Sequence, residues 1–130
     1  MSIAPPVSSP APGLVFEAHA RDVLSRLWAV SLEPRLVRIT EGLNHKFDLV
    51  SRNDETVGDA KFFKNIPVPA AKWSVIAEYV WLLQHVRQAK RRFMVFGQDR
   101  EVPERWLSRF RSLTEGMEFY FLDGDQLTQL

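Results

Sequence analysis

Three polar side chains on either side of one short turn are the residues of this chain best suited to chemistry. Asp48 lies in the apolar segment 47–50, and Asp59 and Lys61 lie in the apolar segment 58–63. Two carboxylates at close range repel each other unless a cation neutralises them. The chain has no cysteine and its 3 histidines are scattered, so hard oxygen ligands favour Mg²⁺ or Mn²⁺ over Zn²⁺.

The residues between these segments predict that the three side chains meet. Residues 51–56 have the Ser, Asn and Asp composition of a turn, which indicates an antiparallel hairpin. If the turn is centred on Asp54 and Glu55, Asp48 lies opposite Lys61. Side chains directly opposite each other, and side chains two residues apart in one strand, lie on the same face of the sheet. Asp48, Asp59 and Lys61 then project together. A one-residue slip or a bulge would send Asp48 to the other face.

Composition limits the class of protein. A length of 130 residues, 45% hydrophobic and 25% charged, is typical of one globular domain with its own core. A net charge of +1 excludes a uniformly basic nucleic-acid coat, so any contact with a polyanion must be local. The absence of cysteine agrees with a cytoplasmic protein, and no apolar run is long enough to span a bilayer.

Periodicity and turn residues predict an α/β domain with a three-layer arrangement. Residues 1–13, rich in Pro, Ser and Ala, are expected to form a disordered tail, and residues 14–130 a single domain. A central mixed sheet of about four to five strands is expected between helices. The predicted elements are a helix over 14–28, a strand over 35–40, hairpin strands over 47–50 and 58–63, a helix over 70–92, a strand over 93–97, a helix over 103–113, a strand over 117–122 and a helical turn over 125–130.

This order of elements resembles the restriction-endonuclease-like PD-(D/E)XK phosphodiesterase superfamily over roughly residues 14–97. Its motif places an Asp on the second strand, then an acid, any residue and Lys on the third, often with a Glu on the first helix. Asp48, Asp59-Ala60-Lys61 and Glu17 match these positions. Phe47 stands where the motif name has Pro, and Asp59 replaces the commoner Glu.

The resemblance implies a metal-dependent nuclease. Asp48, Asp59, the Ala60 carbonyl and Glu17 would hold Mg²⁺ or Mn²⁺, and Lys61 would position the attacking water and stabilise charge on the phosphate. Cleavage would leave a 3′-hydroxyl and a 5′-phosphate. The alternative is a catalytically inactive nuclease-like module that binds or assembles with partners within a protein complex.

Two further expectations concern partners. Lys64, Lys72, Arg87, Lys90 and Arg91 could contact the phosphate backbone of a nucleic acid, with DNA the expected partner, although cations near a helix carboxyl end are also favoured by the helix dipole. The predicted 70–92 helix carries two apolar stripes. The second stripe would be covered by the terminal helices or by a second copy, which predicts a possible homodimer through this helix. The stripes are Trp73, Ile76, Val80 and Leu83, and Val75, Tyr79, Leu82 and Val86.

Overall fold

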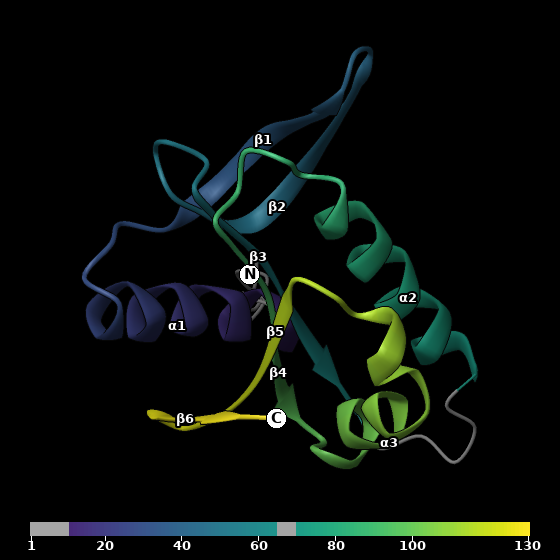
Figure 1. Cartoon of the computed structure of the whole chain (residues 1–130). Coiled ribbons are helices and arrows are strands. Elements are labelled where there is room, and N and C mark those ends of the chain that lie inside the picture. The colour runs from purple at the N-terminus through teal and green to yellow at the C-terminus, as the bar shows by residue number, and fades with distance from the viewer. Residues whose placement is uncertain (1–10, 65–69) are drawn as a thin grey trace, which may run out of the picture.

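The computed structural model describes residues 11–64 and 70–130, which form a six-stranded mixed sheet, three α-helices and one 3-10 helix (Figure 1). Strands follow one another across the sheet in chain order. The β3–β4 and β4–β5 pairs are parallel, and the other three pairs are antiparallel. The elements are α1 (Pro12–Leu27), β1 (Glu33–Thr40), β2 (Leu43–Val50), β3 (Thr56–Phe63), α2 (Ala70–Gln84), β4 (Arg91–Gln98), α3 (Glu101–Phe110), η1 (Arg111–Leu113), β5 (Met117–Asp123) and β6 (Gln126–Gln129).

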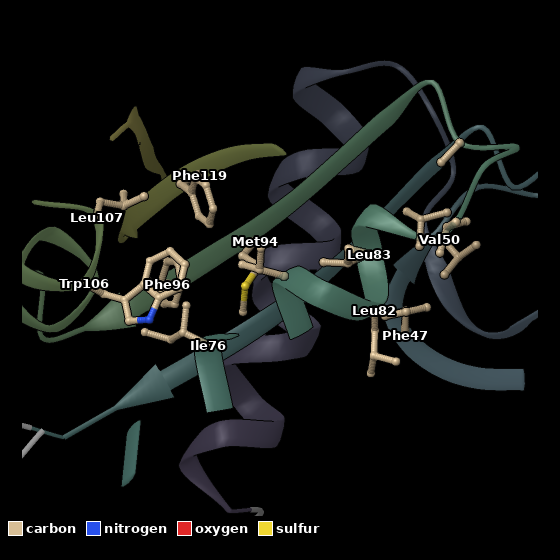
Figure 2. Packing of buried hydrophobic residues seen from close by; sticks show 14 of the residues in the cluster. Phe47, Val50, Ile76, Leu82, Leu83, Met94, Phe96, Trp106, Leu107 and Phe119 are labelled. Atoms are coloured by element: carbon tan, nitrogen blue, oxygen red, sulfur yellow. The ribbon is translucent and has the colours of Figure 1, made fainter. Parts of the chain in front are cut away.

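Helices cover both faces of this sheet, so the predicted α/β sandwich is confirmed at the level of its layers (Figure 1). On one face, α1 packs through Phe16, Ala20 and Leu24 against the buried Phe93 and Val95. On the other face, α2 and α3 enclose the larger core cluster, in which Figure 2 shows Ile76 and Leu83 of α2 beside Met94 and Phe96 of β4, with Trp106 and Leu107 of α3. The four consecutive side chains of residues 93–96 are buried, as expected for a strand covered on both faces.

Two glycines allow aromatic rings to lie directly on the central strands. A Cβ at Gly58 would lie 2.3 Å from the ring of Phe93, and a Cβ at Gly97 would lie 2.4 Å from the ring of Phe16. No side chain fits at such distances unless the ring moves. Gly58 therefore lets Phe93 cover β3 beside Asp59, and Gly97 lets α1 approach β4.

The carboxyl end differs from the expectation. Residues 125–130 were expected to form a helical turn, but residues 126–129 form β6, which pairs antiparallel with β5. The sheet therefore has six strands in the described residues rather than four to five. The cause is Gly124, whose φ of +57° reverses the chain tightly, so that Leu127 pairs with Leu122.

The long predicted helix over 70–92 also ends early, at Gln84. Beyond it the chain turns, with the Ala89 amide donating to the Val86 carbonyl, and Val86 and Ala89 are both buried. The side-chain amide of Gln84 donates to the carbonyls of Leu113 and Glu115, which fixes the end of α2 against the segment that follows α3. Burial of the connection outweighs the helix propensity of residues 85–92.

The hairpin is centred one residue earlier than expected. Val50 pairs with Val57, so the turn is centred on Asn53 and Asp54, and Asp48 does not lie opposite Lys61. Asp54 adopts a φ of +57°, and the Ser51 hydroxyl accepts from the Thr56 amide at 3.0 Å. Moving the centre by one residue moves the pairing by two, and a shift of two by itself preserves the alternation of faces.

A bulge interrupts β2 next to the carboxylates. Glu33 pairs with Val50 but Arg35 pairs with Phe47, so Asp48 and Leu49 together lie opposite Pro34. The bulge places Phe47 in the core on the α2 face and Leu49 in the core on the α1 face. Asp48 lies between them.

The expected tail falls mostly outside the described residues, and α1 already begins at Pro12. Among the described residues, none of the helices has the length and apolar composition needed to cross a bilayer.

Candidate functional site

The two carboxylates are built into the sheet where β2 and β3 separate. The backbone ladder between these strands joins Leu49 with Gly58 and Val50 with Val57. Beyond it, the Asp48 amide donates to Asp59 Oδ1 at 3.1 Å, and the Ala60 amide donates to Asp48 Oδ2 at 3.2 Å. Each carboxylate thus accepts a hydrogen bond from the opposite strand, and this reciprocal pair fixes the position of both.

Asp59 is the buried acid of the site, with only 2% of its surface exposed. Burial, followed by the neighbouring charge of Asp48, raises the pKa of Asp59 to about 8, although the Lys61 ammonium acts in the opposite direction. A raised pKa means that the buried site disfavours a negative charge on Asp59, so a further cation would stabilise its ionised form. Asp59 Oδ2 forms an ion pair with Lys61 Nζ at 2.9 Å.

Lys61 lies on the same face of β3 as Asp59, directly under α2. Its Nζ is 3.7 Å from the ring centroid of Tyr79, and 19% of its side chain is exposed. Burial alone would lower the pKa of Lys61, but the charge and hydrogen bond of Asp59, together with Tyr79, raise it above its ordinary value. Lys61 is therefore an ammonium at every physiological pH, a donor and a positive charge rather than a base.

Glu17 approaches the site from α1, on the other side of the sheet. Burial, then the charge of Asp48, raises the pKa of Glu17, while Arg21, Lys61 and Lys46 lower it. The half-buried Glu17 therefore lies within electrostatic range of both Asp48 and Lys61. Because α1 begins at Pro12, Glu17 lies in the second helical turn, where the helix dipole gives little reason for an acid.

The donors at the site fit a hard divalent cation. Two carboxylates face each other across the gap between β2 and β3, and the buried oxygen Asp59 Oδ2 has the Lys61 ammonium as its partner. In a strand the amide and carbonyl of one residue point to the same neighbour, so the Ala60 carbonyl is directed towards β2, like its amide. Among the described residues, however, no three His, Asp or Glu side chains are clustered closely enough to hold one metal ion.

The predicted basic residues do not form one surface. Lys64 follows the end of β3, and Lys72 Nζ lies 5.3 Å over the ring of Phe63, so these two lie near the carboxyl end of β3. Arg87, Lys90 and Arg91 were expected on the last turns of the helix but lie beyond its end, because α2 stops at Gln84.

Two of these displaced residues are already paired with acids. Lys90 Nζ lies 3.3 Å from Glu55, and Arg91 lies 3.2 Å from Glu118 and stacks over the ring of Trp28. Arg91 pairs with Thr56 in the sheet, three residues from Asp59, which corresponds to roughly 10 Å at the usual rise of a strand.

Sequence reasoning missed three residues of the site's surroundings. Tyr79 was assigned to an apolar stripe, and no signal in the sequence pairs it with Lys61. Arg21 follows Glu17 by one helical turn and Lys46 precedes Asp48 by two residues, so their spacing could have indicated both.

The three residues of the hairpin are therefore brought together, with Glu17 in electrostatic range, and their chemical roles stay predictions. Comparison of the chain with protein-family models, with curated proteins and with solved structures finds no match.

Proposed function

We propose that this protein is a Mg²⁺-dependent nuclease that hydrolyses phosphodiester bonds, with DNA as the expected substrate and the cytoplasm as its expected location. The observation that carries the proposal is the buried carboxyl of Asp59, held by Asp48 and Lys61 at a gap in the sheet. A protein has little structural reason to bury one carboxyl beside a second, because the second raises the pKa of the first.

Asp48, Asp59 and the Ala60 carbonyl would hold the cation, with Glu17 contributing through water. Bound Mg²⁺ would neutralise the scissile phosphate and make water a better nucleophile at neutral pH. In this scheme the water oxygen bonds to phosphorus and releases a proton to solvent, the bond between phosphorus and the 3′ oxygen breaks, and the 3′ oxygen takes up a proton from solvent. The products are a 3′-hydroxyl and a 5′-phosphate.

The role of Lys61 follows from its ammonium state. An ammonium fixed by Asp59 and by the ring of Tyr79 cannot accept the proton of the attacking water. It can donate to an oxygen of the phosphate and stabilise the negative charge that develops there. Lys61 is therefore proposed as the residue that stabilises negative charge on the phosphate during the reaction.

One observation favours the alternative, an inactive nuclease-like binding or assembly module. Asp48 Oδ2 and Asp59 Oδ1 each accept a backbone hydrogen bond from the opposite strand, which gives both acids a structural role where the ladder ends. In that case the fold would keep the acids for stability alone.

Calorimetric titration of Mn²⁺ and Mg²⁺ separates the two functions. We expect the wild-type protein to bind Mn²⁺ and an Asp59→Asn variant, which keeps the size of the side chain, to lose binding. Asp22→Asn is the matched control, because Asp22 is exposed on α1 and paired with Arg26. The control should bind as the wild type does.

Cleavage of branched, single-stranded and duplex nucleic acids completes the test. We expect Asp59→Asn to abolish cleavage, and Lys61→Met to retain metal binding while losing about 100-fold or more in rate. A wild-type protein that binds nucleic acid, but neither binds Mn²⁺ in its presence nor cleaves it, would support the binding module instead.

A further inference from the structure

The hairpin of β1 and β2 extends beyond the rest of the sheet as a two-stranded arm (Figure 1). Its strands pair with each other as far as Thr40 and Leu43, whereas the backbone ladder from β2 to β3 joins only Leu49 and Val50 of β2. Residues 35–46, the β1–β2 arm, therefore form a separate ribbon, and each of its faces must meet either another element or solvent.

One face of the β1–β2 arm is covered by α2. The ring of Tyr79 packs edge-on against the ring of His45, with 5.5 Å between their centroids, and Leu82 lies in the same core cluster as Ile39. Tyr79 and Leu82 belong to the second apolar stripe of α2, which was expected to be covered by the terminal helices or by a second copy. The arm covers this stripe instead, so the stripe does not require a homodimer.

The opposite face of the arm is open and basic. Leu36 lies opposite Lys46 and Arg38 lies opposite Asn44, so these four side chains share the face directed away from α2. All four are exposed. Neither Arg38 nor Lys46 forms an ion pair with any described residue, and the one acid of the arm, Glu41, lies in the turn at its tip. This face therefore offers two cations to a partner.

The open face adjoins the candidate metal site. Lys46 precedes Asp48 by two residues, which is roughly 7 Å along a strand. Arg38 lies diagonally across from Lys46, about 7–8 Å away. Lys46 also lowers the pKa of Glu17, so it is within electrostatic range of the acid that α1 brings to the site. The cations therefore continue directly from the carboxylates along the arm.

The position of these cations identifies the kind of partner. A polyanion near Asp48, Asp59 and Glu17 is repelled by any of these acids that is not neutralised, so cations beside them are needed to hold it. An acidic protein or a lipid surface would also attract Arg38 and Lys46, but neither has a reason to lie against carboxylates. A nucleic acid has that reason, because a phosphate bound through a metal ion at the carboxylates places the neighbouring phosphates where the arm begins.

We propose that the open face of the β1–β2 arm binds the phosphate backbone of the nucleic-acid substrate, with Arg38 and Lys46 contacting phosphates next to the one that is cut. The Asn44 amide donates to the same backbone, and Leu36 packs against a sugar between these contacts. The inference rests on the proposed nuclease function for its choice of partner. Contacts to phosphate and sugar do not read base sequence, so the arm fixes the position of the substrate rather than its sequence.

Salt-dependent DNA binding tests this surface separately from the chemistry. All proteins carry Asp59→Asn, which removes one acid and the expected cleavage, and binding of fluorescein-labelled duplex DNA is followed by fluorescence anisotropy in EDTA. We expect Arg38→Ala combined with Lys46→Ala to weaken binding about 10-fold or more at about 0.1 M salt, and to reduce the slope of log K against log salt concentration by about 1.8, or about 0.9 for each lost phosphate contact. Arg52→Ala is the matched control, because Arg52 is also exposed but lies in the turn at the other end of β2. It should leave affinity and slope unchanged.

The possible outcomes separate this inference from the nuclease proposal. Thermal unfolding by circular dichroism shows that each variant is folded. A folded double variant that binds as the Arg52→Ala control does would overturn the inference, and so would the absence of DNA binding. Cleavage by the wild-type protein together with an unchanged slope would overturn the arm and leave the nuclease proposal intact. A reduced slope in a protein whose wild type cleaves nothing would support the arm and contradict the enzyme.

A fluorescent probe on the arm tests where the DNA lies. The chain has no cysteine, so Leu36→Cys carries a single thiol at a position whose side chain is 64% exposed. Labelled with an environment-sensitive fluorophore, this variant should change its emission when duplex DNA saturates the protein. Leu113→Cys is the control, because Leu113 is 69% exposed but lies beside α2 and α3, on the opposite side of the sheet. No response of the probe at position 36 would overturn the proposal.

Discussion

At the scale of single residues, the site is governed by the burial of one carboxyl. Asp59 is almost fully buried and lies beside a second carboxyl, yet its own strand supplies the ammonium of Lys61 at 2.9 Å. Lys61 in turn is fixed by the ring of Tyr79. The protonation state of Asp59 and the orientation of Lys61 are therefore the two properties on which metal binding and catalysis would depend.

The raised pKa of Asp59 predicts a pH dependence of stability in the metal-free protein. A carboxyl whose folded pKa is raised from 3.8 to about 8 contributes stability that is fully present below the unfolded pKa and is lost as the pH rises through the folded pKa. In the presence of a chelator, we expect the free energy of unfolding of the wild type to fall relative to Asp59→Asn by up to about 1.4 kcal/mol per pH unit between these values. Urea unfolding of both proteins from about pH 5 to about pH 9 measures the difference. Parallel pH profiles would contradict the assignment.

The contact between Lys61 and Tyr79 predicts a coupling energy. An ammonium over an aromatic ring contributes about 0.5–2 kcal/mol, depending on its exposure. We expect Tyr79→Leu to destabilise the protein by this amount in addition to its loss of packing, and Tyr79→Phe to keep the contact. A double-mutant cycle with Lys61→Met isolates the contact from the packing. A coupling energy near zero would mean that Tyr79 acts only as a core residue.

At the scale of elements, β3 is the strand that organises both faces. Its Asp59 and Lys61 lie on the α2 face, and Ala60 and Phe62 on the α1 face. The bulge in β2 beside Pro34 lets Asp48 reach the backbone of β3 while its neighbours Phe47 and Leu49 enter opposite cores. The position of each acid therefore depends on close packing of β3 against its surroundings.

Two glycines test this dependence on packing. Gly58→Ala places a methyl group 2.3 Å from the ring of Phe93, which is fully buried and packs edge-on against Trp28. We expect a loss of about 1–3 kcal/mol or more and weaker Mn²⁺ binding at temperatures where the variant is still folded. Gly13→Ala is the matched control. No atom lies within 4 Å of the position that its methyl group would take, and it belongs to α1, so it should be neutral or stabilise by up to about 1 kcal/mol. Equal melting temperatures for the two variants would contradict this account.

At the scale of the whole molecule, the distribution of charge decides how a polyanion could bind. The net charge is +1, and Lys90 and Arg91, at the amino end of β4, are paired with Glu55 and Glu118. Lys64 and Lys72 lie near the carboxyl end of β3. A nucleic acid that reaches the carboxylates is therefore expected to be held from that end of the sheet.

Salt dependence of DNA binding measures these contacts. Each phosphate contact contributes about 0.9 to the slope of log K against log salt concentration. We expect Lys64→Ala and Lys72→Ala each to reduce the slope by about that amount if each residue contacts one phosphate. Lys90→Ala should leave the slope unchanged, because Lys90 already pairs with Glu55. A slope that falls with Lys90→Ala and not with Lys64→Ala would place the nucleic acid at the opposite end of the sheet.

The sequence by itself determined the order of elements as far as β5 and the meeting of the hairpin side chains Asp48, Asp59 and Lys61. Hydrophobic periodicity depends only on local backbone geometry, so α1, the five strands β1 to β5 and the layered α/β class followed from it. Asp48, Asp59 and Lys61 met despite the wrong centre of the turn, because a shift of two positions preserves the alternation of a strand.

Only the tertiary structure decided the rest, because it depends on contacts between residues distant in the chain. The bulge at Asp48, the early end of α2 and the pairing of β6 with β5 are set by neighbours in space that outweigh local propensity. The pKa of Asp59 and the ring of Tyr79 over Lys61 depend on burial under α2 and on the opposite strand. Periodicity indicates which face a side chain occupies, but only packing determines what it meets there.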